Sequence, residues 1–340
     1  MIRVLIVDDS AFMRTLISDI VDDDPELEVI DTASNGLVAI EKNVQLRPDV
    51  ILMDVEMPKL DGITALSHIM DNNPTPVVML SNLTQKGTHT TIKALEAGAV
   101  DFIPKPSGSI SLNIHSIAEE IVKKVKLAAK VNLKTSRAHR ILPLPSVEMK
   151  NSIKVIVIGA STGGPQTLAS ILKRLPRNIP PVFIVQHMPA EFTGPLADRL
   201  NSLCVFDVRE AKEGDRIKPG QALLAPGGHH MTVKRSKLDN YEIIRLNTDP
   251  PVNSIRPSVD VTMQSVVDVY GDNTIGVLLT GMGCDGAKGM CSIKSSGGKT
   301  IAQDQDSCVI FGMPKSAIEG GCVDKVADLS HIPEEIIHML

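Results

Sequence analysis

The chain has 340 residues, of which 43% are hydrophobic but only 2% are aromatic, and its formal net charge is −5. This length favours two domains, and cores with so few aromatic rings must be built from Ile, Val, Leu and Met, which favours buried aliphatic strands covered by helices. No apolar run approaches the roughly 20 residues of a membrane span, and the N-terminal run is too short for a signal peptide, so we expect a soluble, cytoplasmic protein.

The charge is distributed unevenly along the chain. Residues 1–120 contain 8 basic and 19 acidic side chains, residues 121–150 contain 8 and 1, and residues 151–340 contain 19 and 20. An acidic segment, a basic connector and a near-neutral segment argue against nucleic acid as the main ligand. The 5 cysteines show neither C-x-x-C spacing nor a zinc or disulfide pattern, which suits a reducing compartment.

Short aliphatic runs alternate with helical patterns through the first 125 residues. The runs lie at 3–7, 27–33, 49–54, 76–80 and 99–103. This alternation predicts right-handed crossovers and a doubly wound parallel sheet. A helical pattern continues to about residue 130, and the following Pro, Ser and basic residues are typical of a linker. We therefore predict a first domain at 1–125, a linker at 126–152 and a second domain at 153–340.

The alternation resumes in the second domain. Residues 153–159, 180–186 and 274–281 are typical of buried strands, and residues 257–270 have a helical pattern. Residues 217–235 are interpreted as an antiparallel excursion that turns at Pro226–Gly228. The second domain is therefore predicted to be α/β as well, with a mainly parallel sheet and this excursion.

Polar side chains follow the predicted strands of the first domain. Asp8 and Asp9 end the first strand, Asp54 ends the third, Ser81 the fourth, and Lys105 follows the fifth. The carboxyl ends of parallel strands form the ligand crevice of such a sheet. Three carboxylates there repel one another unless a cation is present, and ligands that offer only oxygen favour Mg²⁺. Each residue alone is explained by helix capping or solvation, but five at successive strand ends favour a site for a metal and a phosphoryl group.

This constellation resembles the receiver domain of two-component response regulators, over about residues 1–125. The resemblance implies a flavodoxin-like fold in which Asp54 accepts a phosphoryl group from a histidine kinase. It also implies that Ser81 and Lys105 contact the phosphoryl group. The resemblance implies that Asp9 and Asp54 bind Mg²⁺ directly, that Asp8 assists, and that the backbone carbonyl of Glu56 completes the metal site.

The stretch GASTGG at residues 159–164 follows a buried apolar run and admits two interpretations. A dinucleotide-binding fingerprint would need glycine where Ser161 stands, and an acid near the next strand end, where Gln186 and His187 stand instead. A nucleophile turn fits better, because the stretch matches G-x-S-x-G between a strand and a helix. The nucleotide site stays open as the alternative.

A serine nucleophile needs a base, usually histidine, that is oriented by an acid. His187 and Asp285 each follow a predicted parallel strand, so both can converge on Ser161. His229 and His230, on the excursion, are alternative bases. The glycines around Asp285, in TGMGCDG, allow backbone N–H groups to approach an oxyanion, although a tight turn capped by Asp285 explains the same motif.

Together with the receiver, the motifs GASTGG, QHMP, PPVNSIRPSVD and TGMGCDGAKGM resemble the chemotaxis protein-glutamate methylesterases, over nearly the whole chain except the linker. The resemblance implies phosphorylation-activated hydrolysis of glutamate methyl esters on chemoreceptors, with release of methanol, and deamidation of receptor glutamines. The implied catalytic residues are Ser161, His187 and Asp285, with the Met282 N–H as oxyanion donor and Thr162 lining the site. Ile255 stands where relatives often have histidine.

The implied partners are methylated chemoreceptors as substrate and a chemotaxis histidine kinase as phosphodonor, with no nucleic acid and no membrane insertion. The receiver would need Mg²⁺ and the esterase no cofactor. Two other functions compete with this one: a nucleotide-binding module under receiver control, and a signalling adaptor without enzymatic activity.

Overall fold

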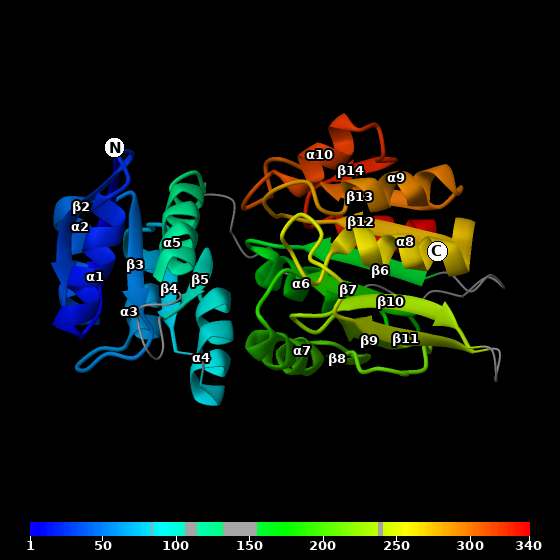
Figure 1. Cartoon of the computed structure of the whole chain (residues 1–340), viewed down its shortest axis with the longest axis horizontal. Helices are drawn as coiled ribbons and strands as arrows, with labels where there is room; N and C mark the ends of the chain where they lie inside the picture. The colour runs from blue at the N-terminus through cyan, green and yellow to red at the C-terminus, as the bar shows by residue number, and fades with distance from the viewer. Residues whose placement is uncertain (83, 106–113, 132–154, 237–240) are drawn as a thin grey trace. The chain divides into compact units, whose positions relative to one another are not determined.

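The computed structural model describes residues 1–82, 84–105, 114–131, 155–236 and 241–340. The chain divides into two compact units, Met1–Lys134 and Thr135–Leu340. Each unit has a sheet of its own, and both are mainly parallel, as the alternation of aliphatic runs and helices predicts (Figure 1).

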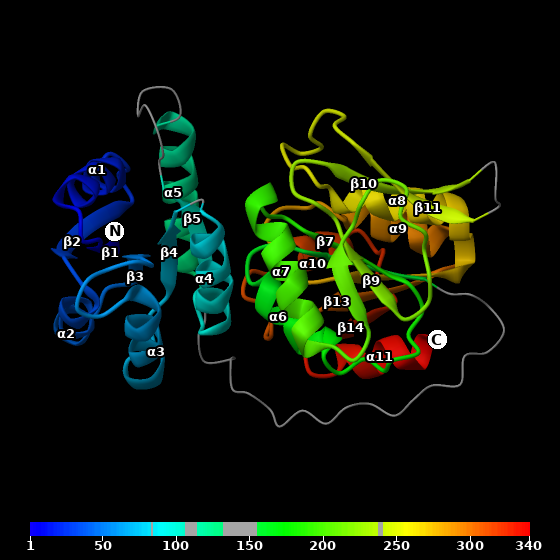
Figure 2. The same ribbon diagram turned by 90° about the horizontal axis from the view of Figure 1, so that it is seen from below.

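The first unit is a five-stranded parallel sheet in the order β2-β1-β3-β4-β5. Its strands are β1 (Ile2–Val7), β2 (Leu27–Ala33), β3 (Val50–Asp54), β4 (Val77–Ser81) and β5 (Asp101–Pro104). Its helices are α1 (Ala11–Asp22), α2 (Gly36–Leu46), α3 (Gly62–Asn72), α4 (Gln85–Glu96) and α5 (Ile114–Ala128). Helices α1 and α5 pack together on one face, and α2, α3 and α4 cover the other (Figure 2). This is the flavodoxin-like fold expected of a receiver.

Helix α5 continues past the predicted domain boundary at residue 125 and ends at Ala128. Its last turn is bound to the first unit, because the Lys126 ammonium lies 2.9 Å from carboxylate oxygens of both Asp24 and Glu26. The remainder of the predicted linker, from residue 132 onward, lies outside the described residues.

The second unit has a seven-stranded parallel sheet in the order β14-β13-β12-β6-β7-β9-β8. Its strands are β6 (Val155–Ala160), β7 (Val182–Gln186), β8 (Asp207–Glu210), β9 (Gln221–Leu224), β12 (Thr274–Leu278), β13 (Lys299–Gln303) and β14 (Lys325–Ala327). Its helices are α6 (Gly164–Leu172), α7 (Ala190–Leu203), α8 (Val259–Tyr270), α9 (Ala287–Ser295), α10 (Met313–Glu319) and α11 (Ile332–Met339). A separate antiparallel pair consists of β10 (His230–Arg235) and β11 (Glu242–Asn247).

The antiparallel excursion is present and the chain turns at residues 227–228, but this turn does not join antiparallel neighbours as predicted. Strand β9, which precedes that turn, belongs to the main sheet and runs parallel to β7 and β8. The antiparallel partner of β10 is β11, farther along the chain. The prediction failed because a Pro-Gly-Gly turn says where a strand ends but not which strand becomes its neighbour.

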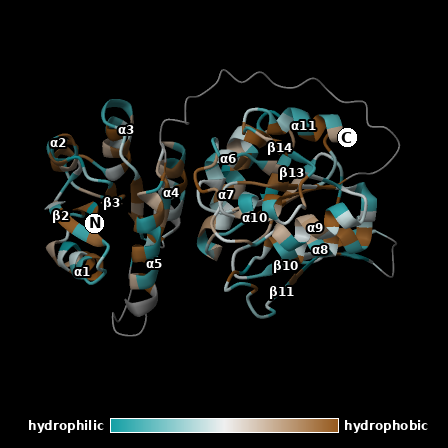
Figure 3. Cartoon of the chain, turned by 90° about the horizontal axis from the view of Figure 1, so that it is seen from above, coloured by the Kyte–Doolittle hydropathy of each residue, from teal (hydrophilic) through white to brown (hydrophobic). Residues whose placement is uncertain are grey.

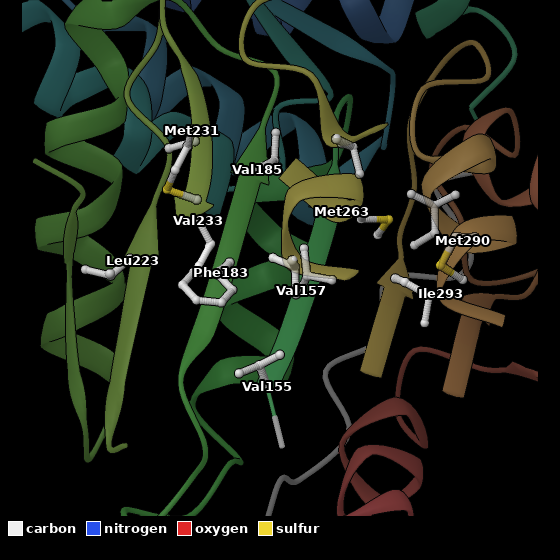
Figure 4. Packing of buried hydrophobic residues seen from close by; sticks show 14 of the residues in the cluster. Val155, Val157, Phe183, Val185, Leu223, Met231, Val233, Met263, Met290 and Ile293 are labelled. Atoms are coloured by element: carbon white, nitrogen blue, oxygen red, sulfur yellow. The ribbon is translucent and has the colours of Figure 1, made fainter. Parts of the chain in front are cut away.

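Helices cover both faces of the second sheet. In Figure 2, α8, α9 and the β10–β11 pair lie on one side of the sheet, and α6 and α11 lie on the other. Helix α8 buries Val259, Met263 and Val266 and exposes Gln264 and Asp268, which is typical of helices that cover a sheet. Figure 3 colours these helices by hydropathy. The core beneath α8 and α9 is aliphatic and sulfur-rich and includes Val157, Phe183, Met263 and Met290, all fully buried (Figure 4).

Cys291 on α9 and Cys322 after α10 form a disulfide in the structure, with their Cα atoms 4.5 Å apart. The sequence analysis found no disulfide pattern, because the two cysteines are 31 residues apart and meet only where α9 packs against α10. Within the described ranges, every helix is too short or too polar to cross a lipid bilayer.

Candidate active site

Three strands of the second sheet end side by side and bring Ser161, His187 and Thr280 together. The parallel register pairs Gly159 of β6 with Leu278 of β12, and Ala160 of β6 with Gln186 of β7. Beyond these pairs, the Ser161 N–H donates to the Thr280 carbonyl at 3.0 Å, and the His187 N–H donates to the Ala160 carbonyl at 3.1 Å. The sheet therefore holds the serine and the histidine as neighbours.

The chain turns sharply directly after Ser161. The Gly164 N–H donates to the Ser161 carbonyl at 2.7 Å, and Gly163 adopts a left-handed φ of 78° before α6 begins. A Cβ at Gly163 would lie 2.5 Å from Val309, and one at Gly164 would lie 1.9 Å from Gln186 Oε1. The close approach of Val309 and Gln186 thus explains why residues 163 and 164 are glycines, without a bound phosphate. The structure favours the nucleophile turn over the phosphate cradle.

His187 and Asp285 are in direct contact. Nε2 of His187 lies 2.8 Å from Asp285 Oδ2, and the His187 side chain is only 9% exposed. Because an ionised carboxylate can only accept, Nε2 carries the hydrogen, and Nδ1 is left as the basic nitrogen. In the described part of the chain no hydrogen bond joins the Ser161 hydroxyl to His187. Bonds of this kind often tighten only when substrate is bound.

The Asp285 carboxylate is buried and accepts four hydrogen bonds. Besides His187, its donors are Ser258 Oγ at 2.7 Å and the N–H groups of Val259 and Asp260 at 2.7 and 3.2 Å. Burial by itself would raise the pKa of the Asp285 carboxyl, but the hydrogen bonds from His187, Ser258 and Val259 outweigh it and lower that pKa. The N-terminus of α8 adds a favourable dipole. Asp285 is therefore ionised at neutral pH and able to orient an imidazole.

The loop between β12 and α9 lies against the serine. A Cβ at Gly281 would come within 2.7 Å of the Ser161 Cβ, and Met282 is the next residue. Within the described ranges, the Met282 N–H donates no hydrogen bond, and the residue is 37% exposed. A free N–H beside a nucleophile is suited to bind an oxyanion. The Thr162 carbonyl accepts a hydrogen bond from Thr280 Oγ1 at 3.0 Å, which fixes the turn.

The two alternative bases have other surroundings. His230 is 1% exposed, with Nδ1 accepting from the Ser258 N–H at 3.2 Å and Nε2 donating to the Pro250 carbonyl at 3.2 Å. Both of its ring nitrogens are occupied. His229 is exposed, and its Nδ1 lies 3.4 Å from the Gly227 carbonyl oxygen. Ile255 lies in a turn with Val252, three residues before Ser258.

The acidic residues of the first unit surround Lys105. Its ammonium lies 2.7 Å from Asp8 and 2.8 Å from Asp54. Burial raises the pKa of the Asp54 carboxyl to about 6, although Lys105 acts in the opposite direction. Burial alone would lower the pKa of Lys105, but the carboxylates of Asp54 and Asp8 raise it. The lysine thus partly neutralises two buried acids.

Asp9 is exposed, and the ligand oxygens of Asp8, Asp9 and Asp54 lie within 4.8 Å of one another. This set of oxygen ligands fits Mg²⁺. Ser81 ends β4 as predicted, but its hydroxyl is 2.5 Å from Thr91 Oγ1 rather than in contact with Asp54. The sequence analysis missed Thr91, because nothing in a helical segment marks a residue that faces the end of a neighbouring strand.

Two further residues of the second site were missed. Gln186 is buried and donates from Nε2 to the carbonyls of Ser161 and His187, at 2.9 and 3.1 Å. Ser258 binds Asp285 and is the N-cap of α8. The only signal for Ser258 in the sequence was a serine before a helical pattern, which predicts a cap and nothing more.

Comparison with known proteins gives two family matches. The family described as CheB methylesterase matches residues 156–336, and the response regulator receiver domain matches residues 4–115. A protein of Archaeoglobus fulgidus named protein-glutamate methylesterase/protein-glutamine glutaminase is 48% identical over 99% of this chain and 98% of its own length. A protein of Thermotoga maritima with the same name is 46% identical over 100% and 98%. The crystal structure of the Thermotoga maritima CheB methylesterase catalytic domain matches 56% of this chain and 100% of its own length, with 44% identity and a TM-score of 0.54.

Proposed function

Because the chain belongs to the CheB methylesterase family and carries a receiver domain, we propose that it hydrolyses glutamate methyl esters on chemoreceptors and deamidates receptor glutamines. The His187–Asp285 contact beside Ser161 carries the assignment of the catalytic residues. The receptors are the substrate, and a chemotaxis histidine kinase is the phosphodonor. Residues 1–125, extended by the last turn of α5, form the receiver, and the methylesterase domain begins near residue 153.

Ester hydrolysis at this site begins with the Ser161 hydroxyl. Its oxygen attacks the ester carbonyl while His187 Nδ1 takes the proton, since Nε2 is bound to Asp285. The tetrahedral oxyanion accepts a hydrogen bond from the Met282 N–H. The protonated histidine then gives its proton to the departing methoxide, which leaves as methanol. Water repeats the sequence on the acyl-serine and releases glutamate.

The same residues account for deamidation. With a glutamine side chain, the group that leaves is ammonia instead of methanol, and the acyl-serine that forms is identical. Thr162, on the turn after the nucleophile, lines the approach to Ser161. Asp285 stays ionised through both reactions, because its pKa is held below the ordinary value.

Phosphorylation of the receiver centres on Asp54. Asp9 and Asp54 would hold Mg²⁺ directly, with Asp8 assisting, and the metal would neutralise charge on the phosphoryl group. Lys105 lies within 2.8 Å of Asp54 and can bind a phosphoryl oxygen. Ser81 would reach that group after its hydroxyl leaves Thr91. The new charge at Asp54 activates the esterase.

Methanol release from membranes that contain methylated chemoreceptors tests this function. The full-length protein should release methanol, and faster when Mg²⁺ and a small phosphodonor such as acetyl phosphate are present. Ser161→Ala and His187→Ala should abolish release, because members of a triad act as a unit. Asp54→Asn should keep the basal rate and lose the stimulation.

Ser202→Ala is the matched control, because it removes an exposed hydroxyl from helix α7. It should behave as wild type. Methanol release by Ser161→Ala at the wild-type rate would refute the catalytic assignment, and stimulation of Asp54→Asn would refute the assignment of the phosphorylation site.

A further inference from the structure

Ser258 is a fully buried serine that contacts the catalytic acid and has no assigned role. It is the N-cap of α8, with φ −106° and ψ 135°. Its hydroxyl donates to Asp285 Oδ1 at 2.7 Å and accepts from the Val261 N–H at 3.4 Å. The first bond is short and charge-assisted, whereas the capping bond is at the long limit of hydrogen bonding. The hydroxyl therefore serves Asp285 more than it serves the helix.

We propose that Ser258 is a positioning residue for hydrolysis at Ser161, because its hydroxyl holds the Asp285 carboxylate in the rotation that aims Oδ2 at His187 Nε2. This inference rests on the function proposed above, in which Asp285 orients His187. Ser258 does not touch the substrate and acts only through the acid.

The other contacts of Asp285 explain why a further donor matters. Oδ2 is shared between His187 and the Val259 N–H, at 2.8 and 2.7 Å. On Oδ1 the Asp260 N–H is a weak donor at 3.2 Å. Without the Ser258 hydroxyl, the strong donor on Oδ1 is lost, and the carboxylate can rotate away from the imidazole.

The backbone of Ser258 is held in place by a hydrogen bond to His230. Its N–H donates to His230 Nδ1 at 3.2 Å, and His230 Nε2 donates to the Pro250 carbonyl. The Ser258 carbonyl accepts from the Thr262 N–H, so the hydroxyl projects from a residue whose N–H and carbonyl are both hydrogen-bonded. Buried donors and acceptors arranged in such a chain hold one another in place.

Helices α8 and α9 are tied to each other by the same region. Asp285, which precedes α9, accepts from the N-terminal N–H groups of α8, and Asp260, in the first turn of α8, accepts from the Gly289 N–H of α9 at 2.8 Å. The acid that precedes α9 thus binds the N-terminus of α8, and an acid in the first turn of α8 binds the N-terminus of α9. The titratable groups that act on Asp285 directly are His187 and Asp260. His230 is separated from Asp285 by Ser258, from whose N–H it accepts, and the charge of Lys288 lowers the pKa of Asp260.

Two substitutions separate positioning from capping. Ser258→Ala and Ser258→Gly both remove the hydroxyl, but glycine is tolerated at an N-cap and alanine is not. If Ser258 positions Asp285, kcat for methanol release per folded molecule should fall by about 10-fold in both variants, because each loses a hydrogen bond to a charged group. KM should be unchanged, since substrate contacts are intact. The folded fraction is measured by circular dichroism on the full-length protein.

Ser265→Ala is the matched control. Ser265 lies on the same helix, and its hydroxyl bonds the Val233 N–H and the Thr262 carbonyl without touching the triad. Its kcat should equal that of wild type. A kcat within about twofold of wild type in Ser258→Gly, or a loss confined to Ser258→Ala that follows its unfolding, would overturn the inference.

Ser161→Ala in the same assay separates this inference from the proposed function. If Ser161→Ala is inactive while both Ser258 variants turn over normally, only the positioning role is wrong. If Ser161→Ala retains turnover, the catalytic assignment itself fails, and the role of Ser258 fails with it.

Discussion

Replacing Asp285 by Asn changes one oxygen into an NH₂ group at a point where four donors converge. Oδ2 accepts from His187 Nε2 and the Val259 N–H, and Oδ1 accepts from Ser258 Oγ and the Asp260 N–H. An amide has one oxygen to accept and two hydrogens to donate. It can therefore serve only one of the two pairs of donors.

Both orientations of the amide leave a backbone N–H unpaired. If the NH₂ group faces His187, the imidazole can switch tautomer and accept from it. The Val259 N–H can only donate and loses its acceptor. If the NH₂ group faces Ser258, the hydroxyl can rotate and accept from it. The Asp260 N–H can only donate and loses its acceptor. A buried unpaired donor costs about 1–3 kcal/mol of the free energy of unfolding. The tautomer switch would place a hydrogen on Nδ1, where the base is needed, and in other triads such a change lowers kcat by about 10⁴-fold.

We therefore expect Asp285→Asn to remain folded, to lose about 1–3 kcal/mol of stability in urea unfolding, and to lose up to about 10⁴-fold in methanol release. Asp268→Asn, an exposed acid on the same helix α8, is the control and should change neither quantity. Turnover by Asp285→Asn within about tenfold of wild type would refute the role of Asp285 as the orienting acid.

Three further predictions concern residues outside the triad. Acetyl phosphate with Mg²⁺ should phosphorylate the wild type on Asp54 and leave Asp54→Asn unlabelled, and a label elsewhere, found by mass spectrometry, would contradict the assignment. The pKa of Asp54 is raised to about 6 in the fold, so its charge destabilises the receiver above that pH and is relieved as the pH falls from about 6 to about 4. In EDTA, the free energy of opening of the receiver sheet is measured by hydrogen exchange. The stability advantage of Asp54→Asn over wild type should shrink by about 2 kcal/mol between pH 7.5 and 4, and a pH-independent difference would refute the raised pKa. Gly164→Ala should push Gln186 off the Ser161 carbonyl, because the new Cβ would lie 1.9 Å from Gln186 Oε1, and should cost about 1–3 kcal/mol and most of the activity. Gly194→Ala, whose Cβ would meet only Glu210 at 3.9 Å, should be harmless in both assays.

The parallel sheets could be predicted from the sequence because their strands are buried on both faces and appear as unbroken aliphatic runs. The β10–β11 pair could not be placed in the same way. β9 has the composition of a strand in either orientation, and its pairing with β7 depends on contacts between segments about 40 residues apart. The Cys291–Cys322 pair escaped notice for the same reason, since it depends on the packing of α9 against α10.

Much of the candidate site was accessible from strand ends. Ser161, His187 and Asp285 follow buried parallel strands, and the carboxyl ends of such strands meet at one edge. The sequence favoured His187 over His230 by its position after a strand, but it gave no sign that His230 is buried between Ser258 and Pro250 with both ring nitrogens bonded. Ser258 was hidden because a serine that only caps a helix and a serine that also binds a buried carboxylate look alike in sequence.

Covalent trapping of Ser161 tests the central claim most directly. A serine-directed fluorophosphonate should modify the full-length protein once, at Ser161, with loss of methanol release in proportion to labelling. His187→Ala should react far more slowly, because the serine then has no base. The account predicts a tryptic peptide labelled at Ser161 and a rate of labelling that rises when acetyl phosphate and Mg²⁺ are present. Complete inactivation with Ser161 unmodified, or normal esterase activity after Ser161 is fully labelled, would contradict it.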